Sequence, residues 1–560
     1  MSRKSLTIGL MLSCMVALPG TGHAGADMQM NIPGSHLPGD LHPGGHCQGE
    51  HKKPSDPAIV TEDGPLKGIT SPDMNEYLGI PYAAPPVGAR RWTPPEPPGR
   101  WHGVLEATQV GNVCPQLDFF GNEFGNEDCL YLNVYTPGLK KNHDRHEGLP
   151  VMVWIHGGAM VTGSGGDYDP SPLVQKGDVI VVTINYRLGF LGIFANPAVD
   201  AEGHLNGNYG LMDQQFALGW VKRNIAAFGG DPDRVTIFGE SAGGLSVLSQ
   251  LASPTAAGLF QRAIEESGAY DSFMDFEQHF YTLPAAEAIV AAFYGDFGCS
   301  SQTSECLRSL PDSVFIHGQP GMLYPVLDGN VLVQPPGPAI AGGQFNRVPV
   351  ITGTNHDECR FNIVLQYDYL GNPLKDTDYQ AAVAANSSLS VDDPLVQFLM
   401  YVLYPLSNYP PPPGVQSAPL ALGALMTDAG QACPGRNAAR FLSQYVPTYM
   451  YEFNDENAPL IGGLIPASFP LGAYHSAEIQ YLFNQQGIPA FTADQQQLSD
   501  AMIAYWTRFA AKGNPNGPDT PVWLPYNAQT DQVQSLVPPT PTVKYNFDAD
   551  HKCTSFWNTL

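Results

Sequence analysis

One pentapeptide of the chain combines residue types that could attack a carbonyl group. In Gly239-Glu240-Ser241-Ala242-Gly243 a serine lies between two glycines, directly after the apolar run Val235–Phe238 and before a helix-compatible stretch, 242–251. Small residues permit a sharp turn from strand to helix, and the first helical turn offers N–H groups to a developing oxyanion. This setting predicts a nucleophile elbow with Ser241 as the nucleophile. A serine in an ordinary turn is the alternative.

A glycine-rich turn lies upstream of this pentapeptide. His156-Gly157-Gly158-Ala159 follows the apolar run Val151–Ile155. A turn placed after a buried strand and before the elbow can supply further backbone N–H donors to the oxyanion. The alternative is a glycine turn without a chemical role.

Both turns must be positioned by a β-sheet, and the sequence contains patterns that predict such a sheet. Near-continuous apolar runs of strand length are typical of a parallel sheet covered by helices on both faces. These runs are Val151–Ile155, Val179–Ile184, Val235–Phe238 and Pro349–Thr352. Helical periods occur at Leu211, Leu218, Val221 and Ile225, and again at Leu498, Met502, Tyr505, Trp506 and Phe509. The alternation predicts an α/β chain, and the absence of a repeat or composition break within residues 57–560 predicts one large domain.

Composition excludes several classes of protein. The 560 residues are 43% hydrophobic and only 14% charged, so the bulk of the chain is not intrinsically disordered. Its formal charge of −26 repels phosphate backbones and anionic lipid surfaces, and nucleic acid is therefore not an expected partner. Beyond residue 26, no apolar stretch reaches the roughly 20 residues of a membrane-spanning helix, so no membrane span is expected.

Residues 1–26 have the pattern of a secretory signal peptide. Arg3 and Lys4 precede the apolar run Leu6–Leu18, and a small-residue stretch ends in Ala24-Gly25-Ala26. The pattern predicts a secreted or periplasmic protein. A lipoprotein signal around Cys14 is a weaker alternative, because the residues before this cysteine are not the small ones expected there.

Residues 27–56 form a segment rich in Gly, Pro and His without hydrophobic periodicity, and we interpret it as a flexible leader. Its potential metal ligands are His36, His42, His46, Cys47 and His51. Zinc or copper binding is the alternative, but the spacing matches no tetrahedral pattern. No metal and no cofactor are predicted.

Further blocks of the sequence resemble the type-B carboxylesterases of the α/β-hydrolase superfamily, which include cholinesterases and certain fungal lipases. The blocks are Leu78–Gly88, Glu127–Asn133, Asn185–Phe190, Gly207–Gln214, Phe228–Pro232 and Gly239–Gly244. The resemblance implies an α/β-hydrolase fold across residues 57–560, with a central, mostly parallel twisted sheet, flanking helices and large loop insertions. It also implies a secreted serine carboxylesterase that acts on small-molecule esters through an acyl-enzyme intermediate.

The resemblance assigns the remaining members of a catalytic triad. Glu358 matches the family's acid, because Gly353-Thr-Asn-His-Asp-Glu358 follows a predicted strand, and Asp357 is a weaker rival. His475 matches the histidine that precedes a Glu-Ile pair. The order Ser241, Glu358, His475 is that of α/β hydrolases. We expect His475 to be neutral near pH 7 and to accept the proton of Ser241.

Other site residues also follow from the resemblance. It implies that the backbone N–H groups of Gly158, Ala159 and Ala242 hold the oxyanion. It further implies a buried acid at Glu240 and a supporting hydroxyl at Ser267.

The family's disulfide pattern matches six cysteines of this chain. It implies the pairs Cys114–Cys129, Cys299–Cys306 and Cys433–Cys553. Cys47 and Cys359 remain, and they are either free thiols, which we favour, or a fourth bridge.

Two departures from the family bear on the substrate. The 114–129 loop contains no Trp, which argues against a cholinesterase, and it is too short for the lid of an interfacial lipase. Gln319 and Gly321 stand where cholinesterases place bulky acyl-pocket side chains, so acyl groups larger than acetyl are expected to fit. A secreted lipase or polyester hydrolase is the main alternative, and a non-catalytic binding protein on the same fold is the other. The sequence does not predict the oligomeric state.

Overall fold

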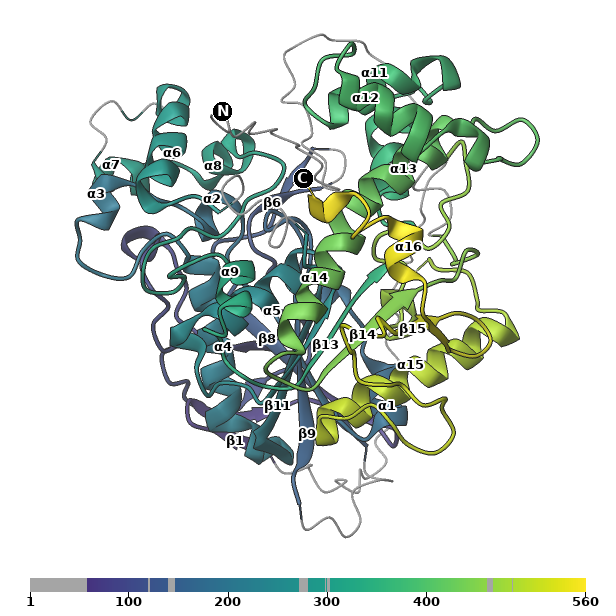
Figure 1. Ribbon diagram of the computed structural model, residues 1–560. Helices are drawn as coiled ribbons and strands as arrows, with labels where there is room; N and C mark the ends of the chain where they lie inside the picture. Colours follow the sequence, from purple (N-terminus) through teal and green to yellow (C-terminus); the bar gives the residue numbers. More distant parts are fainter. Residues whose placement is uncertain are drawn as a thin grey trace, which may run out of the picture.

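A computed structural model describes residues 58–118, 121–138, 147–270, 280–297, 299, 303–460, 467–485 and 487–559. The predicted signal peptide and leader, residues 1–56, lie outside this part of the chain. The described chain is built around one large sheet with helices on both sides (Figure 1).

The central sheet has eleven strands in the order β16-β15-β14-β13-β12-β11-β9-β10-β8-β4-β3. Its parallel strands are β9 Leu149–Ile155, β10 Ile180–Ile184, β11 Gly230–Glu240, β12 Arg262–Glu266, β13 Val350–Asn355, β14 Thr448–Phe453 and β15 Val533–Leu536. Antiparallel strands complete the two edges: β3 Ile69–Thr70, β4 Met74–Pro81, β8 Tyr131–Pro137 and β16 Thr542–Lys544. The prediction of a mostly parallel sheet is confirmed, and each of the four apolar runs falls largely within one of its strands.

Both faces of the sheet are buried, which explains the continuous apolar runs. Within β9, Val151, Val153 and Ile155 enter one hydrophobic core, whereas Met152 and Trp154 enter the other. Side chains of a strand alternate between faces, so a strand with a core on each side has no polar positions.

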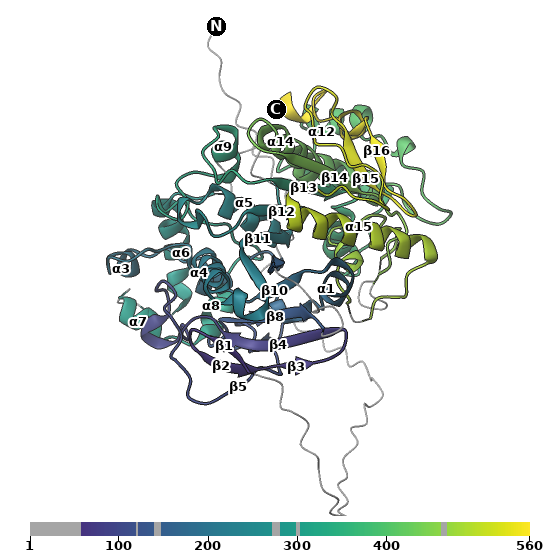
Figure 2. The same ribbon diagram turned by 90° about the horizontal axis from the view of Figure 1, so that it is seen from below.

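Helices from distant parts of the chain cover the two faces. Figure 2 shows α4 (Tyr209–Asn224), α5 (Ala242–Ala252) and α9 (Pro336–Ala341) on one side, and α1 (Ser171–Gly177) and α15 (Ala493–Lys512) on the other. The two predicted helical periods lie in α4 and α15, except that Ile225 falls just past the end of α4. Helix α15 begins with a capping box between Thr492 and Gln495 and ends at Gly513, which adopts the left-handed conformation.

Long insertions follow β12 and β13, and most of their helices lie at one end of the sheet, whereas α9 and α14 (Cys433–Leu442) pack on one face of it (Figure 1). The first contains α6 Leu283–Phe297, α7 Ser304–Ser309, α8 Asp312–Gly318 and α9. The second contains α10 Arg360–Ile363, α11 Tyr379–Asn386, α12 Pro394–Phe398, α13 Ala418–Thr427 and α14. The prediction of large insertions is therefore confirmed.

Smaller elements complete the described chain. They are β1 Ile59–Thr61, β2 Gly64–Lys67 and β5 Leu105–Glu106 in a three-stranded sheet, the hairpin β6 Gln116–Leu117 and β7 Glu123–Phe124, and the short helices α2 Gly189–Gly192, α3 Pro197–Asp200 and α16 Phe547–His551.

Disulfides join the three cysteine pairs that the resemblance implies: Cys114–Cys129, Cys299–Cys306 and Cys433–Cys553. Cys359 is also disulfide-bonded and fully buried. The preference for a free thiol at Cys359 is therefore wrong. Its partner lies outside the described residues.

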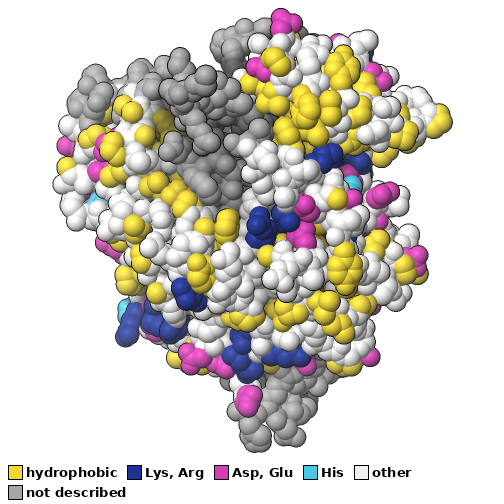
Figure 3. Space-filling view, viewed as in Figure 1, with side chains coloured by type: hydrophobic (Ala, Val, Ile, Leu, Met, Phe, Trp, Pro, Cys, Tyr) yellow, Lys and Arg dark blue, Asp and Glu magenta, His cyan; other side chains and the backbone are white. Residues whose placement is uncertain are grey.

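On the face shown in Figure 3, Lys and Arg side chains of the described residues gather in small groups with acidic side chains nearby, rather than in one continuous basic surface. In the described part of the chain, no helix combines the length and the apolarity that crossing a membrane requires.

Candidate active site

Ser241 occupies a strained turn between β11 and α5. Its φ of 58° and ψ of −123° are rarely adopted by a residue with a side chain, and such a conformation costs on the order of 1–3 kcal/mol. Its N–H donates to the carbonyl of Glu266 at 2.9 Å, and its own carbonyl accepts from the N–H of Leu245 at 2.8 Å. These bonds hold the backbone in place on both sides of the serine.

The two flanking glycines are required by close packing rather than by their own dihedral angles. A Cβ atom at Gly243 would lie 2.0 Å from the carbonyl oxygen of Ile155, and one at Gly239 would lie 2.5 Å from the same atom. Strand β9 therefore lies so close to the elbow that any larger residue at Gly239 or Gly243 would push the strand and the elbow apart.

Glu358 and His475 meet at the end of β13. The Nδ1 atom of His475 lies 2.5 Å from Oε2 of Glu358, whose side chain is fully buried. The other carboxylate oxygen, Oε1, accepts from the N–H of Asn355 at 2.7 Å and from Oγ1 of Thr354 at 2.9 Å. The backbone N–H of His475 also donates to the carbonyl of Glu358 at 3.2 Å. Glu358 is thus oriented to hold one tautomer of the imidazole.

Asp357, the rival acid, has different partners. Its Oδ2 accepts from the N–H of Ala473 at 3.0 Å, and its Oδ1 pairs with Nη2 of Arg360 at 2.8 Å. The bond to His475 belongs to Glu358, which favours Glu358 as the acid.

The other ring nitrogen of His475, Nε2, points toward the turn that contains Ser241. Nε2 of His475 lies 3.3 Å from Oε1 of Glu240, the residue before Ser241, and forms no hydrogen bond to any described residue. His475 therefore links Glu358 on one side to the end of β11 on the other.

The glycine-rich turn passes directly beside the nucleophile. A Cβ atom at Gly157 would lie 3.2 Å from Cβ of Ser241. Gly158 and Ala159 both have positive φ, 96° and 56°, which turns the backbone sharply. Within the described residues, the N–H groups of Gly158 and Ala159 donate to no backbone carbonyl. These groups are available to an oxyanion.

Comparison with known proteins agrees with this geometry. The carboxylesterase family model matches residues 55–556. The chain belongs to the carboxylesterase family. It is 35% identical over 506 residues to a cocaine esterase from Homo sapiens, with 85% of each chain covered. It is 36% identical over 499 residues to a para-nitrobenzyl esterase from Bacillus subtilis (strain 168), covering 85% of this chain and 94% of the relative.

A solved structure of a PNB esterase has the same fold. It superimposes with a TM-score of 0.71 at 33% identity, and the match covers 89% of this chain and 99% of the other. The chain is therefore a carboxylic ester hydrolase with the α/β-hydrolase fold. Its substrate class is small-molecule esters.

Buried carboxyl groups dominate the electrostatics of this carboxylesterase's site. Burial alone would lower the pKa of His475, but the negative charges of Glu240 and Glu358 outweigh it and raise that pKa above its ordinary value. Burial raises the pKa of Glu240 as well, against the opposing charge of His475. The negative charges of the buried carboxyls therefore favour the imidazolium over the neutral imidazole.

Sequence reasoning missed two residues that organise this region, Asn355 and Glu478. The side-chain nitrogen of Asn355 donates to Oε2 of Glu478 at 2.5 Å and to the carbonyl of Tyr474 at 2.8 Å. These bonds tie the end of β13 to the segment that carries His475. Glu478 was visible as the Glu of the Glu-Ile pair, but nothing local pointed to Asn355.

Ser267 is buried and has a positive φ of 50°. Its N–H donates to the carbonyl of Gly353 at 2.9 Å, whereas its hydroxyl forms no hydrogen bond to a described residue. The structure thus gives Ser267 a backbone contact with β13 and no side-chain bond to the triad.

The segment assigned to the acyl pocket contacts the oxyanion turn. The N–H of Leu323 donates to the carbonyl of Ala159 at 3.2 Å. Gln319 uses its side-chain oxygen to accept from the N–H of Phe190 at 3.1 Å, and Gly321 is half-buried. This segment therefore lies beside the residues that would bind the ester carbonyl.

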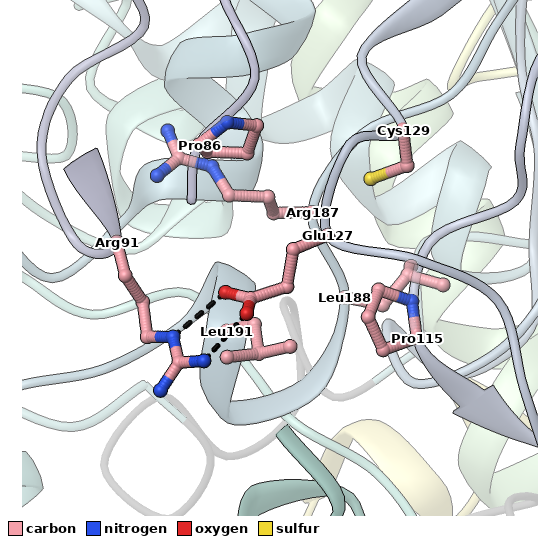
Figure 4. Close-up of a pocket in the computed structure, with 8 residues that line it drawn as sticks. All are labelled: Pro86, Arg91, Pro115, Glu127, Cys129, Arg187, Leu188 and Leu191. Carbon is pink, nitrogen blue, oxygen red and sulfur yellow. Dashed lines mark hydrogen bonds and ion pairs between the residues drawn. The ribbon is translucent and has the colours of Figure 1, made fainter. Parts of the chain in front are cut away.

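A small cavity beside the Cys114–Cys129 disulfide is separate from these groups (Figure 4). Its volume of about 10 Å³ is room for one water molecule. It is lined by Pro86, Arg91, Pro115, Glu127, Cys129, Arg187, Leu188 and Leu191. Arg91 and Glu127 form a two-point ion pair at 2.7 and 2.5 Å across it. The cavity is too small for an ester.

Proposed function

We propose that this carboxylesterase is an exported serine esterase that hydrolyses small carboxylic esters through Ser241, His475 and Glu358. The observation that carries the proposal is the position of His475. Its Nδ1 is bonded to a fully buried carboxylate, while its Nε2 faces the end of β11 that carries Ser241. The contact between His475 and Glu358, together with the approach of His475 to the neighbour of Ser241, supports a triad built from three distant parts of the chain.

The chemistry follows from this arrangement. Nε2 of His475 takes the proton of Ser241 as Oγ attacks the ester carbonyl, and Glu358 stabilises the imidazolium that forms. The carbon–oxygen bond then breaks, and the alcohol leaves with that proton. Water attacks the acyl-enzyme by the same route and releases the acid.

The oxyanion of each tetrahedral intermediate would be held by the N–H groups of Gly158, Ala159 and Ala242. The first two have no backbone acceptor among the described residues, and the third lies at the start of α5, where the helix dipole favours negative charge. Loss of one such donor typically raises the barrier by about 3–4 kcal/mol.

The proposal includes residues 57–560 as one catalytic domain behind a signal peptide, 1–26, and a leader, 27–56. Disulfides such as Cys433–Cys553 persist in oxidising compartments, which supports export. The short 114–129 loop supports an esterase rather than an interfacial lipase, since little chain is left to cover a lipid-binding cleft.

The test is a series of para-nitrophenyl esters of increasing acyl length, run on wild type, Ser241→Ala and Ser249→Ala. Ser249 is a matched control, because it is a buried serine of α5 whose hydroxyl forms no hydrogen bond to a described residue. Ser241→Ala should lose about 10⁵-fold in kcat, and Ser249→Ala should remain close to wild type. A fluorophosphonate probe should label Ser241 and no other serine.

Each alternative has its own outcome in this experiment. A folded Ser241→Ala protein that turns over esters at the wild-type rate would refute the mechanism. Rates that rise only with long-chain or aggregated substrates would indicate a lipase. A wild-type chain that neither hydrolyses the series nor reacts with the probe would indicate a binding protein.

A further inference from the structure

A second cluster of chemically active side chains lies outside the catalytic residues. His356 follows β13, Glu452 lies in β14, and His551 ends α16. One nitrogen of each histidine and one oxygen of Glu452 all lie within 4.8 Å of one another. Three separate chain segments thus bring two imidazoles and a carboxylate to one point.

Both histidines are oriented in the same way. Nδ1 of His551 lies 2.6 Å from Oδ1 of Asp428, and Nδ1 of His356 lies 3.1 Å from Oδ1 of Asp357. Histidines that bind metals almost always donate their other ring N–H to a carboxylate or carbonyl, which fixes the tautomer and makes the free nitrogen a better ligand. The Nε2 atoms are therefore the ones left to bind an ion.

Glu452 is held so that one of its oxygens points to these nitrogens. Oε1 lies 2.7 Å from Nε2 of His551. Oε2 accepts from Nζ of Lys544 at 2.7 Å and from Nδ2 of Asn454 at 2.9 Å. The bonds to Oε2 thus fix the carboxylate, and Oε1 remains directed toward His551.

The cluster is open to solvent on one side only. Glu452 is fully buried and the side chain of His551 is 3% exposed, whereas that of His356 is 39% exposed. An ion can therefore reach the buried ligands past His356.

A plain ion-pair network is the competing explanation, because His551 already bridges Asp428 and Glu452 and two lysines lie nearby. That network is complete without His356. The hydrogen bond of His356 to Asp357 uses Nδ1, and one ring nitrogen of this histidine also lies within 4.8 Å of the ligand atoms of Glu452 and His551. A third donor aimed at a satisfied ion pair is explained by an ion that all three donors share.

We propose that His356, Glu452 and His551 bind a zinc ion, or a divalent transition metal of similar preference, with water as the fourth ligand. Two imidazoles and one carboxylate are a donor set that zinc accepts in a tetrahedral site. Donors of such a site lie about 3.4 Å apart. Glu452 and His551, which are 2.7 Å apart, would separate slightly, and partly exposed His356 would move toward them by about 1 Å. The metal replaces the proton between His551 and Glu452, which leaves to solvent.

No spacing pattern in the sequence indicates this site, since its ligands come from three distant segments. The ion would link the end of β13 to β14 and to the C-terminal helix α16. His356 is two residues before Glu358, so the metal would lie next to the segment that positions the triad acid.

The test compares zinc binding by the full chain of wild type, His356→Ala and His204→Ala after removal of metal with EDTA. His204 is the matched control, because it is a histidine beside a carboxylate, Glu202, at 3.2 Å, outside the cluster. Thermal unfolding is measured at a zinc concentration a hundredfold above the dissociation constant, and Co²⁺ absorption is measured with one equivalent of metal. The comparison between variants removes any contribution from the histidines of residues 27–56, which all three proteins share.

Zinc should raise the melting temperature of wild type and of His204→Ala by about 2–3 °C and leave His356→Ala unshifted. One equivalent of Co²⁺ should give a tetrahedral spectrum that His356→Ala lacks. His551→Gln should also lose the zinc-induced shift and the Co²⁺ spectrum. If His551→Gln does not fold, the comparison of wild type with His356→Ala decides the test alone. An equal zinc shift in wild type and His356→Ala, or no shift in any of the proteins, would overturn the proposal.

Discussion

Replacement of Glu240 by glutamine is expected to move the acid limb of the kcat/KM profile to lower pH. Catalysis needs the neutral form of His475, and the negative charge of Glu240 raises the pKa of that histidine. Glutamine keeps the shape of the side chain and removes the charge. The neutral imidazole is then reached at lower pH, and activity near pH 6 rises relative to the plateau.

The magnitude follows from the distance between the two groups. At 3.3 Å and an effective dielectric constant of about 20, the interaction is about 5 kcal/mol, which corresponds to a shift of roughly 3–4 pKa units. Burial raises the pKa of Glu240 itself, so this carboxyl is not fully charged across the neutral range. We therefore expect a smaller displacement, of at least about one pH unit.

The assay is the pH dependence of kcat/KM for a soluble nitrophenyl ester between about pH 5 and 10. Glu265→Gln is the matched control, since Glu265 is an equally buried carboxyl at the same edge of the sheet but bonds to Thr352 and Gly268 instead. An unchanged limb in Glu240→Gln, or a limb moved to higher pH, would refute the reasoning. If Glu265→Gln moved the acid limb by the same amount, the effect would come from the combined negative charge of the buried acids and not from Glu240 in particular.

Three further changes test other parts of the molecule. Replacing Cys433 and Cys553 by serine opens a loop of 120 residues and should lower the free energy of unfolding by about 2–5 kcal/mol, measured by denaturant titration. Arg187→Gln leaves the buried carboxylate of Asp213 without its two-point partner and should cost about 3–5 kcal/mol in the same measurement. Gly321→Phe should depress turnover of hexanoyl esters while sparing acetyl esters. An unchanged chain-length profile would show that other residues form the acyl pocket.

The parts of the site that could be predicted are those whose signal is local. The elbow at Ser241 needs an apolar strand, small flanking residues and a helix start, all within about fifteen positions. The glycine-rich turn at Gly158 follows its strand in the same way. Glu358 and His475 have no such local signal, and only the resemblance to a family identified them.

What could not be predicted depends on contacts between distant segments. The 3.3 Å approach of Glu240 to His475 comes from the packing of β11 against the segment after β14, and no pattern encodes it. For this reason the upward shift of the His475 pKa could not be predicted, and the neutral imidazole near pH 7 stays a prediction. The preference for a free thiol at Cys359 was wrong for a similar reason, because pairing depends on where another segment lies.

Buried acids on β12, the strand beside β11, limit the conditions under which the fold is stable. Burial raises the pKa of Glu265 to about 7 from an ordinary value of 4.5, and that of Glu266 is raised as well. A raised carboxyl pKa contributes stability that is fully present below about pH 4.5 and is lost as the pH rises through 7, by about 3 kcal/mol for Glu265. Activity also depends on pH, because His475 must be neutral, but the raised pKa of His475 puts the rise in activity above the pH range in which Glu265 loses this stability. Different buried carboxyls thus govern the two effects: Glu240 and Glu358 act on His475, and Glu265 and Glu266 act on stability.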